Sequence, residues 1–314
     1  MGTVLTLLSL FLSWAQAQPS VGFTTVFQGA LGDTSALDGA YSVDVEMEIP
    51  LGSCGSSYVH LEGGDGSGVT DEVPGSSADA LGQAGSVFSV AEFVWKLPVG
   101  EKFSMALGKL DPTAFFDGNE FANDECTQFL ADMFVNTPAL PWPDYAPGIK
   151  LSFLPRGEEG SAISFGIFKA DAAWDDMTED LFAIGEVDLK LLGGNYRAYL
   201  WRGSGSWGIG ASLDQPISSH LGAFARFGAP RDPVDGVKAA WSLGAQLSFG
   251  EESALGLALG RNVREERDET RLEAYFRLDL GRVSLSPDVQ LVANPEGEDM
   301  KAAVLGLRVQ VNYP

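Results

Sequence analysis

The chain has 314 residues, of which 45% are hydrophobic and 20% are charged, and its formal net charge is −23. The apolar content excludes a disordered acidic protein, and the length suits one or two folded domains. The negative charge argues against nucleic acid as a partner, because nucleic-acid binding needs a basic surface.

The N-terminal segment predicts a secretory signal peptide at residues 1–17. An apolar run from Val4 to Trp14 is followed by Ala15-Gln16-Ala17, a small-residue cleavage site, although no Lys or Arg precedes the run. A buried helix is the alternative interpretation. The run is too short for a membrane-spanning helix, and no other stretch approaches 18 consecutive apolar residues, so a helical membrane bundle is excluded.

The only two cysteines, Cys54 and Cys126, are a candidate disulfide, because an exported protein reaches an oxidising space. Two unpaired thiols are an equally open alternative. The two histidines, His60 and His220, are scattered, and so few Cys and His residues argue against a structural zinc site. We therefore predict no bound metal and no cofactor.

Most of the remaining chain consists of segments in which apolar and polar residues alternate, which is the period of a β-strand. In residues 271–280, for example, Leu272, Phe276 and Leu278 fall on one face, and Arg271 and Glu273 fall on the other. The pattern predicts roughly sixteen strands, near residues 20–29, 40–49, 56–62, 86–97, 102–109, 147–154, 161–170, 179–190, 194–203, 206–214, 219–227, 237–249, 252–262, 268–281, 282–292 and 301–313.

Many of these strands have about ten to thirteen residues, which is longer than is usual in soluble proteins and suits a tilted crossing of a bilayer. Short connections alternate with long ones, and the apolar faces carry almost no charge. We predict an all-β fold, a transmembrane antiparallel β-barrel of about 16 strands formed by residues 18–314 as one domain, because a sheet in lipid must close to satisfy its backbone. A soluble β-sandwich or solenoid is the alternative.

Two motif-like stretches carry no recognisable chemistry. Gly203, Gly205 and Gly208 have the spacing of a dinucleotide-binding motif, but a strand pattern follows them where a helix is required. Residues 117–125 resemble a calcium loop in composition, yet Gly118 stands at position two and not at position six. No Ser-His-Asp or Cys-His set is credible, so we do not expect an enzyme.

The segment from residue 100 to residue 148 resembles the carbohydrate-selective porins of the OprB family. The similar pieces, in order, are Gly108-Lys109-Leu110-Asp111, Phe121-Ala122-Asn123-Asp124, Thr127-Gln128-Phe129-Leu130 and Tyr145-Ala146-Pro147-Gly148. The C-terminal part is also similar to that family, so the resemblance covers about residues 85–314. The chain departs from the family in ending Tyr313-Pro314, where such barrels usually end in an aromatic residue, and in being shorter than many relatives.

The resemblance implies a bacterial outer-membrane barrel, embedded in lipid, through which sugars and other small solutes diffuse, with a loop at about residues 111–148 folded inward as a constriction. The acidic and amide groups that the resemblance assigns to solute binding are Asp111, Asp117, Asn119, Asn123, Asp124 and Glu125. The rings of Phe115, Phe116 and Phe121 would pack on sugar faces or anchor the loop to the wall. Lining residues of the opposite wall would be Arg197, Arg226, Glu273, Arg277 and Arg308.

Three alternatives to a sugar channel stay open: a general porin for ion transport without sugar selectivity, an outer-membrane enzyme, and a soluble secreted β protein. The excess of carboxylates predicts a weak cation preference if many of them line the channel mouth. Homotrimers are common among porins, but no feature of this sequence fixes the oligomeric state.

Overall fold

The computed structural model describes residues 17–77, 88–157, 160–250 and 252–313. The predicted signal peptide, apart from Ala17, lies outside these residues. The strands are β1 (Gln18–Gly32), β2 (Ala36–Pro50), β3 (Ser56–Asp65), β4 (Ser89–Val99), β5 (Phe103–Leu110), β6 (Ala146–Phe153), β7 (Ala162–Lys169), β8 (Leu181–Leu191), β9 (Gly194–Gly203), β10 (Ser206–Pro216), β11 (Leu221–Pro230), β12 (Val237–Phe249), β13 (Ser253–Arg264), β14 (Glu269–Asp279), β15 (Val283–Ala293) and β16 (Lys301–Tyr313).

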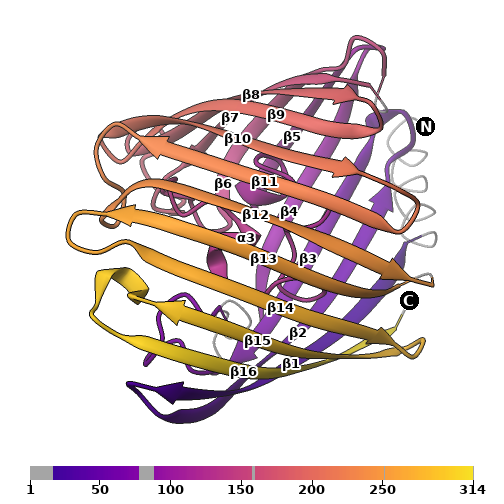
Figure 1. Cartoon of the computed structure of the whole chain (residues 1–314). Helices are drawn as coiled ribbons and strands as arrows, with labels where there is room; N and C mark the ends of the chain where they lie inside the picture. The colour runs from indigo at the N-terminus through magenta and orange to yellow at the C-terminus, as the bar shows by residue number, and fades with distance from the viewer. Residues whose placement is uncertain (1–16, 78–87, 158–159, 251, 314) are drawn as a thin grey trace.

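The strands form one closed antiparallel barrel, in which each strand pairs with its neighbours in the sequence and β1 closes against β16 (Figure 1). The closing pair runs from Val21 opposite Tyr313 to Gly32 opposite Ala302. Closure leaves no free sheet edge, so every strand has a backbone partner on both sides. The predicted sixteen-stranded barrel is therefore confirmed for the described residues, and each predicted strand boundary lies within four residues of the observed one.

The two faces of the sheet follow the alternation predicted from the sequence. On β14, Leu272, Phe276 and Leu278 point outward and are exposed, whereas Arg271 and Glu273 are 0% exposed on the inner face. Large exposed apolar side chains recur on the outside of most strands, which is the inverse of a soluble protein. This belt of apolar side chains suits contact with lipid tails and the polar interior suits water.

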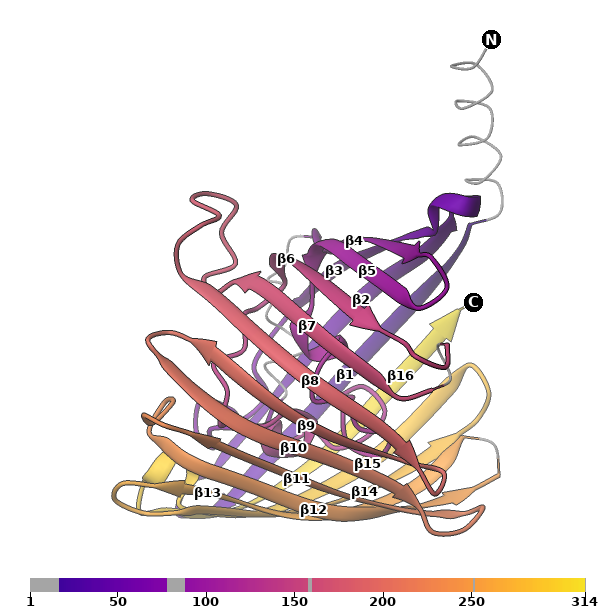
Figure 2. The same cartoon turned by 90° about the horizontal axis from the view of Figure 1, so that it is seen from above.

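The longest connection among the described residues joins β5 to β6 and lies inside the ring of strands (Figure 2). It contains the single turn η2 (Pro112–Ala114) and the short helix α3 (Asp132–Val135). The other short helical segments, η1 (Gly52–Cys54) and η3 (Pro295–Gly297), lie in connections between strands. Among the described residues, none of the helices is long and apolar enough to cross a membrane.

The interior core is formed where this connection packs on the wall. Phe129 of the connection contacts Tyr275 of β14 edge to face at 4.9 Å between ring centroids, and it also contacts Phe224 of β11 at 5.7 Å. Phe116 packs edge to face on Phe168 of β7. The connection is therefore held in the barrel by separate apolar clusters, one around Phe116 and one around Phe129.

Candidate functional site

The connection between β5 and β6, residues 111–145, is the candidate constriction loop. Asp111 begins it: its carboxylate accepts hydrogen bonds from the Thr113 backbone N–H and hydroxyl at 2.7–2.8 Å, which fixes the turn η2. Tyr145 ends it, where the chain enters β6. Between these residues the loop has no Lys or Arg, so every cationic group that meets its oxygen atoms comes from elsewhere in the chain.

Asp117 is the centre of the contact between the loop and the wall. It is 0% exposed, and its carboxylate lies 2.9 Å from Nε of Arg226 without hydrogen-bond alignment, so the contact is an ion pair. The Tyr199 hydroxyl donates to Oδ1 at 2.9 Å, and the Thr137 N–H donates to Oδ2 at 3.2 Å. Burial raises the pKa of Asp117, and the guanidinium of Arg226 opposes that rise.

Arg226 of β11 also binds the loop backbone. Its guanidinium donates to the carbonyl oxygens of Phe134, Asp117 and Ala122 at 2.9–3.0 Å, and to Oδ1 of Asn123 at 3.2 Å. Five donors in a rigid plane allow one arginine to meet several acceptors at once. Arg226 therefore fixes three separate points of the loop to one place on the wall.

Two further wall residues hold the loop from other strands. The carboxylate of Glu273, on β14, accepts the backbone N–H groups of Leu130 and Ala131 at 2.6 and 2.9 Å. Arg308 of β16 donates to the carbonyl oxygen of Glu125. Together with Arg226, these residues anchor the loop to β11, β14 and β16, and all three are buried.

Glycines in the strands allow the loop to approach the wall closely. Asn119 donates to Ser212 Oγ and to the Leu213 carbonyl, both at 3.1 Å, which brings the Phe121 ring over Gly222. A Cβ atom on Gly222 would clash with that ring. The rings of Phe116 and Phe121 thus anchor the loop, which is one of the two roles that the resemblance allowed them.

Several of the predicted solute-binding groups lie against the wall and not in the passage. Asp117 and Asn119 are buried, with their polar atoms bonded to the protein, and Asn123 accepts from Arg226. Arg226, Glu273 and Arg308 face inward as predicted, but they hold the loop. Because the polar atoms of the loop and of the wall are already bonded to each other, these groups do not face the passage.

Arg197 and Arg277 contact strand carboxylates. Arg197 lies 2.5 Å from Asp214 and 3.4 Å from Asp188, and Arg277 lies 3.3 Å from Glu252. Each arginine is therefore compensated locally along the wall, as expected for charges on the inner face of a barrel.

The candidate disulfide is corrected by the structure, in which both cysteines are free. Cys54 is exposed in η1, in the connection between β2 and β3, whereas Cys126 lies within the constriction loop beside Thr24. Burial raises the pKa of the Cys126 thiol, and the neighbouring carboxylates of Asp124 and Glu125 raise it further.

Among the charged residues that line the passage, acidic ones outnumber basic ones. On one side of the loop lies a cavity of about 760 Å³, whose lining includes Asp44, His60, Glu62, Asp124 and Glu125. This cavity also reaches the strand ends that are joined by short turns, since Gly281 and Arg282 line it. The composition of the wall favours cations and hydrogen-bond donors as passing groups.

A second cavity, of about 520 Å³, shares Glu62 and Glu125 with the first and is also lined by Lys109, Asp111 and Tyr145. Burial raises the pKa of Asp111 to about 6 and that of Glu125 to about 7. Of the predicted solute-facing groups, Asp111, Asp124 and Glu125 are thus the ones that line the two cavities.

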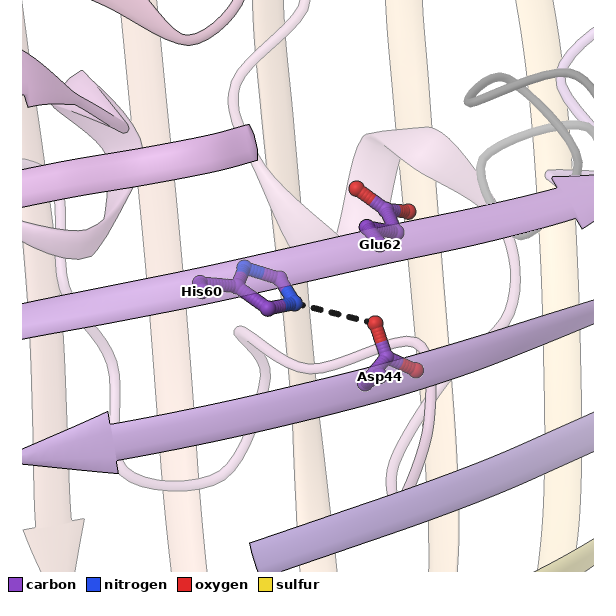
Figure 3. A group of neighbouring side chains, drawn as sticks. All are labelled: Asp44, His60 and Glu62. Carbon is purple, nitrogen blue, oxygen red and sulfur yellow. Dashed lines mark hydrogen bonds and ion pairs between the residues drawn. The ribbon is translucent and has the colours of Figure 1, made fainter. Parts of the chain in front are cut away.

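Sequence reasoning missed the lining residues on the early strands, Asp44, His60 and Glu62. The sequence contained the information needed to find them. Asp44 on β2 and both residues on β3 stand at alternating positions that face the barrel interior. Among the described residues these three side chains also form the one group that could hold a metal ion, with all ligand atoms within 4.8 Å of one another (Figure 3).

Comparison with known proteins agrees with the fold and the resemblance. Residues 193–313 match the family model described as carbohydrate-selective porin, OprB family. An uncharacterized protein of Aquifex aeolicus (strain VF5) is 30% identical over 213 residues, which is 66% of this chain and 63% of that relative.

Solved structures share the whole barrel. The high pH structure of Pseudomonas putida OprB matches with a TM-score of 0.80 at 12% identity, over 95% of this chain and 94% of that one. A mutant of Rh. blastica porin matches with a TM-score of 0.66 at 10% identity, over 95% of this chain and 100% of that one. The chain is therefore a bacterial outer-membrane β-barrel with the porin fold, and its resemblance to the carbohydrate-selective porins of the OprB family is confirmed over residues 193–313.

Proposed function

We propose that this chain is a passive diffusion channel that lets small hydrophilic solutes, sugars among them, cross the outer membrane. The observation that carries the proposal is the constriction loop, which is anchored inside the closed barrel and has a polar cavity on each side. A loop that only filled the barrel would not leave charged groups facing open space on both sides. The proposal includes no turnover and no cofactor.

The groups on the two cavity walls suit a polyhydroxylated solute. The carboxylates of Asp111, Asp124 and Glu125 accept hydrogen bonds from hydroxyl groups, and Lys109 donates them. The rings of Phe116 and Phe121 are turned to the wall, whereas the rings of Trp142 and Tyr145 line the second cavity beside its polar groups. A solute there can replace its hydrogen bonds to water with hydrogen bonds to the protein. Weak, repeated hydrogen bonds of this kind allow entry without trapping the solute.

A general cation-permeable porin is the second candidate, and the composition of the larger cavity favours it. Its acidic lining residues are Asp44, Glu46, Glu62, Asp124, Glu125, Glu252 and Asp279, against Arg282 and His60 as the basic ones. This excess focuses a negative potential in the passage, which concentrates cations.

Purified protein in liposomes and planar bilayers separates these functions. A sugar channel should swell sugar-loaded liposomes faster than protein-free liposomes, whereas a cation-selective pore without sugar passage should give a reversal potential in a salt gradient and no swelling. Replacing residues 117–126 with a short linker should raise the conductance, because the barrel closes without them. If the intact protein gives no conductance and no swelling, the channel proposal is wrong.

Three further expectations belong to this proposal. Removal of the signal peptide predicts a mature N-terminus at Gln18, which N-terminal sequencing reads directly. Assembly as a homotrimer, carried by the family resemblance, predicts three times the chain mass by light scattering in detergent. The absence of catalysis predicts no release of fatty acid when the protein is incubated with phospholipid.

A further inference from the structure

A compact group of metal-ligating side chains stands on the wall of the channel. Asp44 comes from β2, and His60 and Glu62 come from β3 (Figure 3). The register of the two strands places Asp44 directly opposite Glu62, with His60 two residues along the same face. Nε2 of His60 lies 3.0 Å from Oδ1 of Asp44, and one ligand atom from each residue lies within 4.8 Å of the other two.

Neighbouring residues orient this group. Oε2 of Glu92, on β4, lies 3.8 Å from Nδ1 of His60, on the side of the ring that faces away from Asp44. The Tyr145 ring packs edge to face on His60 at 6.2 Å, and its hydroxyl bonds to Glu62. A histidine that binds a metal commonly has its second ring nitrogen directed at a carboxylate, and this arrangement provides one.

The placement of the carboxylates calls for a cation between them. Like charges directly opposite each other on neighbouring strands destabilise a sheet, and Asp44 and Glu62 occupy such a pair. His60 and Glu62 are only 8% and 7% exposed, so water screens them poorly. A doubly charged ion would balance both carboxylates at once, which a single imidazolium cannot do.

We propose that Asp44, His60 and Glu62 bind a divalent transition-metal ion of the zinc type. One imidazole nitrogen and two carboxylate oxygens are ligands that zinc accepts, and three protein ligands leave a position open for water. Bonds of about 2.0–2.2 Å place tetrahedral ligand atoms about 3.4 Å apart, so the 3.0 Å pair of His60 and Asp44 would have to open slightly and wider pairs would have to close. Calcium and magnesium prefer oxygen ligands only, so they should bind here more weakly.

The ion would sit in the path of the solute. Asp44, His60 and Glu62 line the same cavity of about 760 Å³ as Asp124 and Glu125 of the constriction loop. A bound ion adds positive charge and bulk beside the loop, so it should lower both the current and the cation preference. The site thus goes beyond passive diffusion, because it makes the conductance depend on metal.

A protonated His60 that simply pairs with Asp44 and Glu92 would explain the same contacts without any metal. The two interpretations differ in what zinc does to the protein. Isothermal titration of zinc into chelator-washed protein in detergent measures binding without requiring conduction, so its outcome is independent of the channel proposal. The protein must be free of a polyhistidine tag, because such a tag binds zinc itself.

The chain supplies matched controls. His60→Gln and Glu62→Gln should each weaken zinc binding at least tenfold, which is about 1.4 kcal/mol. His220→Gln removes the other histidine of the chain, and Glu252→Gln removes a carboxylate of the same cavity outside the group, so both should bind as the unmodified protein does. Circular dichroism and liposome swelling without metal check that each variant is folded and open.

In planar bilayers, zinc should lower the single-channel current of the unmodified protein and leave that of His60→Gln unchanged, with magnesium as the control ion. The proposal is overturned if the unmodified protein binds no zinc below millimolar concentration, or if His60→Gln binds it equally well. Zinc binding that leaves the current and the ion preference unaltered would also overturn it, because the ion would then lie outside the passage.

Discussion

Replacing Arg226 with methionine should release the constriction loop from the wall. Methionine keeps an apolar stem but loses the ion pair with Asp117 at 2.9 Å and the hydrogen bonds to three loop carbonyl groups. Removing one partner of a buried ion pair typically costs about 3–5 kcal/mol. The cost falls on the docking of the loop, because the strands keep their backbone pairing. At about 3 kcal/mol, the undocked population rises on the order of a hundredfold.

The effect should depend on pH with a definite sign. Burial raises the pKa of Asp117 and Arg226 lowers it, so in Arg226→Met the pKa rises further. The docked loop then holds a proton that the released, solvated loop loses. Docking is therefore strengthened as the pH falls and weakened as it rises, and the loop of the variant should open more at pH 8 than at pH 5.

Chymotrypsin provides the assay, since the loop contains buried aromatic residues and no site for trypsin. Cleavage in residues 111–145 and an increase in current noise should appear together in Arg226→Met. Arg277→Met is the matched control, because Arg277 pairs with exposed Glu252 at 3.3 Å and, among the described residues, makes no hydrogen bond or ion pair to the loop. If Arg226→Met resists the protease as well as the control does, the anchoring role is wrong.

Three other predictions follow from the site. Glu273→Gln should weaken docking by about 1–3 kcal/mol, because the amide has one oxygen for two buried N–H groups and leaves the other N–H without an acceptor; it should increase chymotrypsin cleavage less than Arg226→Met does. The pKa values of Asp111 and Glu125 are raised to about 6 and about 7, so the constriction loses negative charge as the pH falls from 8 to 5. The reversal potential in a salt gradient should then shift toward lower cation preference, and a constant potential would contradict this. Maleimide followed by mass spectrometry should modify Cys54 quickly and Cys126 slowly, and a disulfide-linked peptide would contradict the free thiols.

The barrel could be predicted from the sequence because its cause is local. Alternation along each strand decides which side chains face lipid, and Leu272 and Glu273 show the rule within two residues. Closure follows from the same pattern, since lipid tolerates no open sheet edge. The inward direction of Arg226 and Arg308 could be predicted for the same reason.

The contacts of those arginines could not be predicted, because their partners are distant in the chain. Arg226 meets the Phe134 carbonyl across 92 positions, and Arg308 meets that of Glu125 across 183. No local pattern encodes such a pair. The grouping of Asp44 with His60 also needed the pairing register of β2 and β3, because a slip by one residue would turn one side chain toward lipid.

The distances along the chain between the loop and its anchors have a consequence for assembly. The loop belongs to the third hairpin from the N-terminus, whereas its anchors arrive with β11, β14 and β16. Glu92 of β4, Glu186 of β8 and Ser212 of β10 can bond the first part of the loop earlier. The later part, from Ala122 to Phe134, has its anchors only when the late strands are in place. A fully buried loop therefore indicates that β16 has paired with β1. In an incompletely assembled barrel, proteases should still cleave the loop.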